Sequence, residues 1–299
     1  MQGKIIKGVG GFYYIHLHDD RIFECKAKGA FRNQNIKPAV GDNVEIDIIS
    51  EEKLTGNMVK IYPRSNKLIR PAVANVDQAI IIFALSNPEP NYNLLDRFLI
   101  MMDRQDVKTI ICLNKSDLVS DDEATKIKDI YEKCGYDVLI TSTYSWEDNK
   151  SEKSGIADLK SIIKGKTTVF AGPSGVGKSS LLNSLTPDAN AATGDISEKI
   201  KRGKHTTRHS ELIFVETDTY IMDTPGFSSL NVEDMEPEML REYYNEFSEY
   251  TASCRFNGCV HINEPDCAVK DALEKGLISN LRYDNYKQMY EELKNKRRW

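Results

Sequence analysis

The stretch that decides the fold is Gly172-Pro173-Ser174-Gly175-Val176-Gly177-Lys178-Ser179, which matches the pattern GxxxxGK[ST]. It follows the apolar run Thr167–Ala171, which predicts a buried strand, and Lys178 opens a stretch of helical spacing. Glycine-rich backbone at a helix N-terminus presents N–H groups to an anion. We therefore expect Gly172 to Ser180 to hold phosphates, with Lys178 on the β- and γ-phosphates and Ser179 on Mg²⁺.

A second motif, Asn114-Lys115-Ser116-Asp117, follows the predicted strand Thr109–Leu113. A carboxylate at Asp117 can accept hydrogen bonds from both N1–H and the N2 amino group of guanine, whereas adenine presents an acceptor at N1. Asn114 would brace the loop, and the Lys115 stem would cover one face of the base. Ser116, between Lys115 and Asp117, completes the expected guanine-binding set. The motif favours GTP over ATP; its alternative is a charged turn.

The order of these two motifs is the reverse of that in an ordinary GTPase, where the phosphate loop comes first. A circular permutation of the same parts explains this order. Thr141 and Ser142, after the predicted strand Asp137–Ile140, would then belong to a second base-contacting loop.

Six strand candidates between residues 66 and 229 alternate with helical stretches. They predict a doubly wound parallel sheet with its ligand loops at the carboxyl ends of the strands.

A third motif, Asp223-Thr224-Pro225-Gly226, follows the predicted strand Thr219–Met222. Asp223 fits a carboxylate that holds Mg²⁺ through water, and the Gly226 N–H fits a contact to the γ-phosphate. The next residue is Phe227, which cannot orient the attacking water as a glutamine would. Another polar group must place that water, or hydrolysis must be slow.

The basic stretch Lys199–Arg208 supplies the candidates for the first switch. A threonine hydroxyl there would complete the Mg²⁺ shell, and we prefer Thr207 over Thr206. His205 can orient or deprotonate water near neutral pH, as can the nearby His209. A solvated basic loop with an incidental histidine is the alternative reading.

The residues before about 64 predict a small all-β unit. Four β-rich runs are broken by Gly and Asp turns, and they fit a five-stranded OB-type barrel, a fold that often binds RNA; the runs are Phe12–His18, Arg21–Cys25, Val44–Ile48 and Met58–Tyr62. The neighbouring aromatics Phe12, Tyr13 and Tyr14 are either core residues or a base-stacking platform. His16 and His18 are expected at exposed strand positions.

The last part of the chain carries a cluster of potential metal ligands: Cys254, Cys259, His261 and Cys267. Three thiolates and one imidazole within fourteen positions predict a closed, tetrahedral and structural Zn²⁺ site, with scattered core cysteines as the alternative. The flanking segments Met239–Tyr250 and Asn280–Lys296 are expected to be helical. The other three cysteines are predicted to be buried thiols; they are Cys25, Cys112 and Cys134.

Composition limits the class of protein. The 299 residues suggest two or three domains, and the formal net charge of 40 − 45 = −5 provides no overall basic field for nucleic acid. Any RNA contact would use local patches such as the switch stretch or Lys294–Arg298. The chain has neither an apolar run of membrane-spanning length nor a signal-peptide core at its start, so we expect a cytosolic protein.

Together, the guanine-reading motif ahead of the phosphate loop, the Gly203-Lys204-His205-Thr206-Thr207 switch, Asp223 to Phe227 and the cysteine–histidine cluster resemble the RsgA family. The members of that family are circularly permuted GTPases that depend on the small ribosomal subunit. The resemblance implies an α/β, circularly permuted P-loop GTPase domain at residues 65–229. An all-β OB-fold barrel for RNA binding would precede it at 1–64, and a small, mainly helical zinc-binding domain would follow at 230–299.

The resemblance also implies a function. Members bind the small (30S) ribosomal subunit and its 16S rRNA through the barrel and the zinc domain, act late in subunit maturation, and hydrolyse GTP to GDP slowly until the subunit stimulates them. The family assigns the water-placing role to the residue that matches His205. It implies Zn²⁺, Mg²⁺ with GTP, a monomer and no membrane. Two alternatives are a nucleotide-gated RNA-binding module with negligible hydrolysis and a GTPase that acts on tRNA or another protein.

Overall fold

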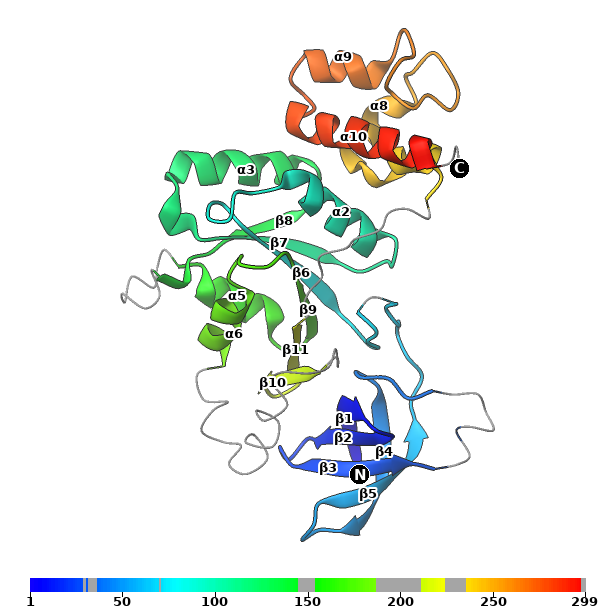
Figure 1. Cartoon of the computed structure of the whole chain (residues 1–299), viewed down its shortest axis with the longest axis vertical. Coiled ribbons are helices and arrows are strands. Elements are labelled where there is room, and N and C mark those ends of the chain that lie inside the picture. Colours follow the sequence, from blue (N-terminus) through cyan, green and yellow to red (C-terminus); the bar gives the residue numbers. More distant parts are fainter. Residues whose placement is uncertain are drawn as a thin grey trace. The chain divides into compact units, whose positions relative to one another are not determined.

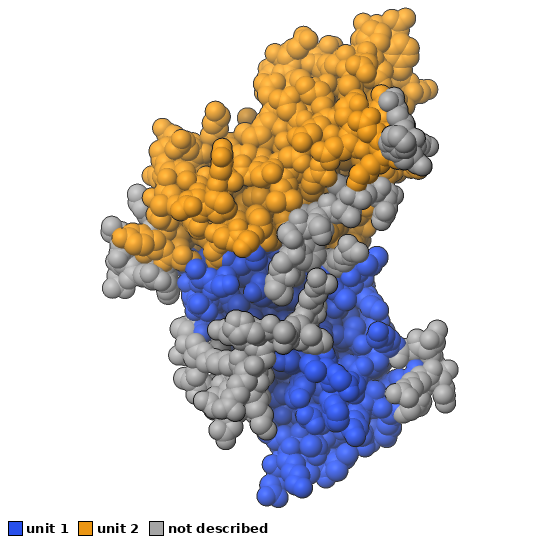
Figure 2. All heavy atoms as spheres, viewed as in Figure 1, with its two compact units in different colours: residues 1–80, 156–171, 178–226 blue, residues 81–155, 172–177, 227–299 orange. Residues whose placement is uncertain are grey.

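A computed structural model describes residues 1–28, 31, 37–69, 71–144, 154–186, 211–223 and 235–296. The chain divides into two compact units, coloured separately in Figure 2. Unit 1 comprises residues 1–80, 156–171 and 178–226, and unit 2 comprises residues 81–155, 172–177 and 227–299. Each unit is therefore assembled from segments that are distant in the sequence.

A closed β-barrel forms the first part of unit 1, and its strands are labelled in Figure 1. The strand order is β1-β2-β3-β5-β4, with β3 and β5 parallel and the other pairs antiparallel. The strands are β1 Gln2–Val9, β2 Phe12–Leu17, β3 Ile22–Ala27, β4 Asn43–Ser50 and β5 Thr55–Ile61. Ile5, Ile15 and Phe23 lie fully buried in its core. The predicted five-stranded, OB-like barrel is confirmed.

Two details of the barrel differ from expectation. Strand β1 was not among the predicted runs, because a β-bulge between Ile5 and Lys7 breaks the alternation that identifies a strand. His16 is only 4 % exposed, whereas we expected a surface position. The ring of Phe214, from a distant part of the chain, packs 4.4 Å from the His16 ring centre and covers it. His18 is exposed, as expected.

The connection that follows the barrel is held tightly. The Arg64 guanidinium donates to both oxygens of the buried Asp42 carboxylate, at 2.6 and 2.7 Å. Asn75 Nδ2 donates to the Gly41 carbonyl at 2.9 Å, and the Asp77 carboxylate accepts the Thr167 N–H at 2.7 Å. The Arg64–Asp42 contact is charge-assisted and bidentate, which makes it one of the stronger types of hydrogen bond in proteins. Within unit 1 they tie the barrel to the strand that precedes the phosphate loop.

A six-stranded sheet follows, in the order β10-β11-β9-β6-β7-β8. Its strands are β6 Gln78–Ala84, β7 Thr109–Asn114, β8 Asp137–Ile140, β9 Thr167–Ala171, β10 Leu212–Glu216 and β11 Thr219–Asp223. The pairs β9–β11 and β7–β8 are parallel, but β10 runs antiparallel to β11. The prediction of a wholly parallel sheet is therefore wrong at this edge. The two residues between β10 and β11 are too few for a crossover and permit only a hairpin.

Helices alternate with these strands. They are α2 Tyr92–Asp103, η1 Ser116–Leu118, α3 Asp121–Lys133, α5 Ile156–Ile163 and α6 Lys178–Leu185. Helix α3 begins where its sequence indicates, because Ser120 and Glu123 form a reciprocal capping box. Among the described helices, none is long and apolar enough to cross a membrane.

The C-terminal part of unit 2 is a small helical subdomain. It consists of η3 Pro237–Tyr243, η4 Asn245–Phe247, α8 Ser248–Thr251, α9 Ala268–Glu274 and α10 Asn280–Lys296. The predicted bounds of α10 are confirmed, and the segment Met239–Tyr250 is helical as expected, although it is divided among η3, η4 and α8. Tyr244 leaves the helical region at φ −107° and ψ 83°. Its ring stacks on Phe247 and meets Tyr286 edge-on, so aromatic packing accompanies the break.

A buried ionic network joins this subdomain to helix α2. Arg282 of α10 is 1 % exposed and lies 2.5 Å from the Asp96 carboxylate and 2.8 Å from Glu246. Tyr131 and Asn285 also donate to Asp96, at 3.0 and 2.7 Å. Every side-chain oxygen of Asp96 thus has a donor, as a buried charge requires. The C-terminal subdomain and α2 are consequently one ionic assembly within unit 2.

Replacement of Arg282 tests how much this network stabilises the fold. We expect Arg282→Met to lower the free energy of unfolding by about 3–5 kcal/mol, because two buried carboxylates lose their cation. Arg255→Met is the matched control, since its ion pair with Asp266 is mostly exposed and is expected to cost at most about 1 kcal/mol. Urea unfolding measures both variants. Equal unfolding midpoints for Arg282→Met and Arg255→Met would contradict the predicted contribution of the network to the free energy of unfolding.

Candidate nucleotide-binding and metal sites

The guanine-reading motif begins at the end of β7, a strand that is buried throughout. Asn114 is fully buried, and its Nδ2 donates to the Val176 carbonyl of the phosphate loop at 2.8 Å. Its Oδ1 accepts the Thr141 hydroxyl at 3.0 Å. Lys115 then adopts a left-handed conformation, φ +61°, which turns the chain into η1. Within unit 2, the base reader is thus hydrogen-bonded directly to the phosphate loop.

The carboxylate of Asp117 is held from one side and exposed on the other. One of its oxygens accepts the hydroxyl of the buried Ser142, while the residue as a whole is exposed. Lys115 Nζ donates to the Asn87 carbonyl, a partner that sequence reasoning missed because a backbone carbonyl leaves no sequence signal. These contacts fix the Asp117 carboxylate and the Lys115 stem, the two groups expected to meet the base.

Thr141 holds the loop of the guanine-reading motif through both its backbone and its side chain. Its backbone N–H donates to the Leu113 carbonyl at 2.8 Å, and its carbonyl accepts the Ser116 N–H at 3.1 Å. Because its side chain is fully buried against Cys112 and Asn114, its hydroxyl serves the reader loop. Direct contact between Thr141 or Ser142 and a base stays a prediction.

Two glycines of the phosphate loop are required by close approaches of backbone and side chains. A Cβ atom on Gly172, whose φ is +146°, would lie 2.1 Å from the Ile82 carbonyl oxygen of β6. A Cβ atom on Gly177, whose φ is +97°, would lie 2.3 Å from Asn114 Nδ2. Neither position accommodates a side chain. The loop therefore passes directly over the strand end and over the reading asparagine, with Ser174 and Gly175 exposed.

In unit 1, Lys178 opens helix α6 and Asp223 ends strand β11. Burial lowers the pKa of the Lys178 amine, while the Asp223 charge raises it. An ammonium and a carboxylate therefore act on each other at the start of the helix that carries Ser179 and Ser180, both exposed. These are the charges that triphosphate and Mg²⁺ binding need. The predicted residues Thr206, Thr207, His205, Gly226 and Phe227 lie outside the described residues, as does His209.

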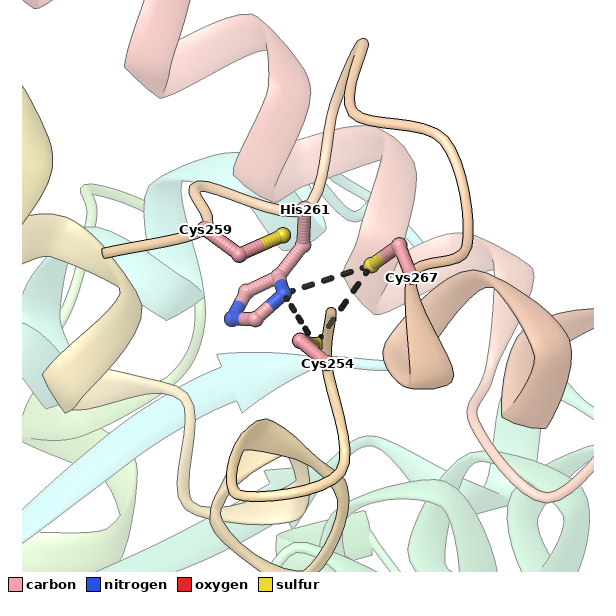
Figure 3. Close-up of side chains that lie close together, drawn as sticks. All are labelled: Cys254, Cys259, His261 and Cys267. Carbon is pink, nitrogen blue, oxygen red and sulfur yellow. Dashed lines mark hydrogen bonds between the residues drawn. The ribbon is translucent and has the colours of Figure 1, made fainter. Parts of the chain in front are cut away.

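The four predicted metal ligands gather in the C-terminal subdomain (Figure 3). Their donor atoms all lie within 4.8 Å of one another. His261 Nδ1 is 3.6 Å from Cys254 Sγ and 3.4 Å from Cys267 Sγ, and those two sulfur atoms are 3.9 Å apart. A disulfide would need a separation of about 2.05 Å. The cluster is therefore a set of thiols and one imidazole that can hold a metal ion.

These distances fit a tetrahedral centre. Metal–sulfur bonds of about 2.3 Å and metal–nitrogen bonds of about 2.0 Å place neighbouring ligand atoms roughly 3.6–3.8 Å apart. Burial lowers the pKa of His261 to about 4, so the ring is neutral at pH 7 and has a lone pair to donate. Burial raises the pKa of the Cys259 thiol to about 12. Deprotonation of that thiol at neutral pH thus requires a nearby cation, which a metal supplies.

The backbone around the cluster is held by side chains of the surrounding helices. The carbonyls of Cys259, Val260 and His261 accept hydrogen bonds from Arg241, Tyr286 and Tyr283, at 2.7, 2.6 and 2.6 Å. The Glu264 carboxylate accepts the N–H groups of Val260 and Ile262. Sequence reasoning missed these partners, because their spacing relative to the ligands follows no motif. They preorganise the loop for its ligands.

Comparison with known proteins identifies the family. A model of the RsgA N-terminal domain matches residues 2–55, and a model of the RsgA GTPase matches residues 61–233. The chain belongs to the RsgA family. The chain is therefore a GTP-hydrolysing enzyme.

Relatives match the full length of the chain. A protein of Agathobacter rectalis named small ribosomal subunit biogenesis GTPase RsgA is 54 % identical over 100 % of both chains. An RsgA of Alkaliphilus metalliredigens is 47 % identical, covering 100 % of this chain and 99 % of the relative. Both alignments therefore extend over the barrel, the sheet and the C-terminal subdomain of this chain.

Two solved structures share the architecture. The crystal structure of YloQ, described as a circularly permuted GTPase, has a TM-score of 0.75 and 39 % identity, over 99 % of this chain and 95 % of that one. YjeQ from Thermotoga maritima has a TM-score of 0.77 and 34 % identity, over 98 % of both chains. The predicted permuted GTPase fold is confirmed for this RsgA-family chain.

Proposed function

We propose that this protein binds the small ribosomal subunit and hydrolyses GTP to GDP and phosphate during late maturation of that subunit, which stimulates the reaction. The hydrogen bond from Asn114 to Val176 carries the nucleotide part of this proposal, because it builds base reader and phosphate loop as one structure. Full-length relatives named as small ribosomal subunit biogenesis GTPases support the ribosomal part.

The roles of the residues follow from their chemistry. Asp117 reads guanine, residues 172–180 hold the phosphates, and Ser179 with Thr207 ligates Mg²⁺. Asp223 holds the ion through water and the Gly226 N–H contacts the γ-phosphate. His205 places the attacking water, since Phe227 cannot. The proposed domains are residues 1–64, 65–229 and 230–299.

The barrel offers a surface suited to ribosomal RNA. Lys26 lies over the Phe12 ring at 5.0 Å from its centre, and Lys60 lies over the Tyr62 ring at 4.7 Å. Lysines beside partly exposed aromatic rings combine phosphate attraction with base stacking. These pairs support contact of the barrel with 16S rRNA, despite the net negative charge of the whole chain.

The cysteine–histidine cluster is proposed to hold one structural Zn²⁺. Four protein donors leave no open coordination position, and the cluster is buried in an aromatic core with Phe247 and Tyr286.

A single copy docking on one ribosomal surface needs no dimer, so we propose a monomer. Its place of action is the cytoplasm, where the proposed subunit partner is found.

Steady-state GTP hydrolysis tests this function directly. The purified protein is measured alone, with small subunits, with large subunits and with bulk tRNA. Strong stimulation by small subunits alone is the expected result. Equal slow turnover in every arm would instead favour a nucleotide-gated RNA-binding module, and a response to tRNA would favour the tRNA-directed alternative.

Substitution of His205 in the switch stretch and of the neighbouring His209 then separates their roles. We expect His205→Ala to keep nucleotide affinity and to reduce subunit-stimulated turnover by about 10²-fold, the usual weight of a general base. His209→Ala is the matched control and is expected to retain most stimulation. If the two variants exchange these behaviours, the water-placing role belongs to His209.

A further inference from the structure

The hairpin formed by β10 and β11 contacts the barrel at both of its ends. Lys7 of β1 forms an isolated antiparallel bridge with Glu211, and its Nζ lies 2.9 Å from the Glu211 carboxylate. At the turn between the two strands, the Asp218 carboxylate lies 3.8 Å from the ring of His18, which follows β2. Both ends of the hairpin therefore contact the β1–β2 side of the barrel.

The middle of the hairpin encloses a barrel histidine. Phe214 and Tyr220 are cross-strand partners, and both pack on His16. The Nδ1 atom of His16 lies 2.9 Å from the Tyr220 hydroxyl. Burial lowers the pKa of His16, so the neutral ring makes a hydrogen bond there. Lys4 adds a second contact, with its Nζ 5.4 Å from the centre of the Tyr220 ring.

Strand β11 connects this contact to the end of the sheet. Tyr220 pairs with Thr167 and Asp223 with Phe170 in a continuous parallel ladder to β9. The three residue steps from Tyr220 to Asp223 span about 10 Å, at roughly 3.3 Å for each step. A hydrogen-bonded strand of this length moves as a unit. The residue that contacts the barrel, Tyr220, and the carboxylate residue Asp223 are therefore parts of one hydrogen-bonded strand.

We propose that Lys7 and His16 are positioning residues for the Mg²⁺ site, because they fix the β10–β11 hairpin on the barrel and thereby place Asp223. The inference rests on the proposed role of Asp223 in holding Mg²⁺. It gives the barrel a second role beside binding. A ribosomal partner that shifts β1 and β2 also shifts the carboxylate on which the reaction depends.

A charge-reversal cycle tests this coupling. The full-length variants are Lys7→Glu, Glu211→Lys and the double exchange. Lys28→Glu is the control, since Lys28 pairs with Asp47 on the exposed surface of the barrel and not with the hairpin. Binding of a fluorescent, non-hydrolysable GTP analogue is titrated with Mg²⁺. Each single reversal is expected to raise the half-saturating Mg²⁺ concentration about fivefold, a common size of coupling between sites. The double exchange and the control are expected to stay within about twofold of the parent.

Restoration by the double exchange separates positioning from a general loss of stability. Tyr220→Phe serves as a milder variant that keeps the ring and removes the hydroxyl bonded to His16, and it is expected to raise the Mg²⁺ requirement in the same direction. An unchanged Mg²⁺ requirement in Tyr220→Phe and in both single reversals would overturn the inference, as would a double exchange that restores nothing.

A second readout distinguishes this inference from the proposed function. The same variants are assayed for GTP turnover with small subunits. If the parent protein gains nothing from subunits while the single reversals still change the Mg²⁺ requirement, the ribosomal part of the proposed function fails and the positioning role stands. If stimulation is present and the Mg²⁺ requirement is the same in every variant, the positioning role alone fails.

Discussion

Asp117→Asn is expected to exchange guanine for xanthine as the preferred base. The carboxylate accepts two donors of guanine, and an amide must turn one of its N–H groups toward the guanine N2 amino group, donor against donor. Xanthine carries a carbonyl oxygen at that place, which the amide N–H can meet. A site that leaves such polar groups unpaired rejects the wrong ligand by about 10³-fold or more.

Ser142 makes this exchange feasible without other changes. Its hydroxyl donates to Oδ1 of Asp117, and an asparagine carbonyl at the same place can accept that hydrogen bond. Competition binding of GTP and XTP measures the exchange, with turnover of both nucleotides as a second readout. Asp122→Asn, the same change at an exposed position of α3, is the control and should leave the preference for GTP intact. Retained GTP preference in Asp117→Asn would remove Asp117 from the base-reading role.

Removal of the proposed Zn²⁺ ion is expected to unfold the C-terminal subdomain. Cys259 and Cys267 are 3 % and 1 % exposed, and they form part of the same buried cluster as Tyr244, Phe247 and Tyr286. Without a cation the thiols stay protonated and the loop loses its crosslink. We expect Cys267→Ala to cost at least about 4 kcal/mol, which corresponds to a fall of at least roughly 16 °C in the Tm of a subdomain of this size.

Metal analysis and thermal unfolding check this expectation together. One equivalent of Zn²⁺ is expected in the parent protein and none in Cys267→Ala, and a chelator should reproduce the loss of Tm. Cys25→Ala, which removes a buried thiol of the barrel, is the control. This variant should keep the metal and lose only the small amount of stability that a core substitution costs. An unchanged Tm after complete metal removal would contradict a structural role.

Local patterns account for the parts of the fold that sequence alone predicted well. Helix α10 has its predicted bounds because the segment Asn280–Lys296 contains no glycine or proline that would break the helix. Helix α3 starts beside a capping serine, and the phosphate loop lies between β9 and α6 as its motif requires. In each case the signal lies within a few residues of the feature.

Features created by distant residues were not predictable. Nothing near His16 in the sequence indicates that Phe214 and Tyr220 cover it, so strand alternation placed it on the surface. Arg282 reads as an ordinary helical surface residue, although it is among the most buried side chains described. In the nucleotide site, the reading residues were found from motifs, while the Asn87 carbonyl that holds Lys115 was not.

The separation along the chain of Asp96 and Arg282 has a consequence for biosynthesis. The two residues lie 186 positions apart, so a growing polypeptide releases the aspartate long before its arginine is made. Until α10 is complete, α2 must keep that carboxylate in water or bury it without its cation, and burial of an unpaired charge is strongly unfavourable. Unit 2, which contains the guanine-reading motif, therefore reaches its final stability only after residue 282 has been made. Nascent chains that stop before residue 282 are expected to remain immature.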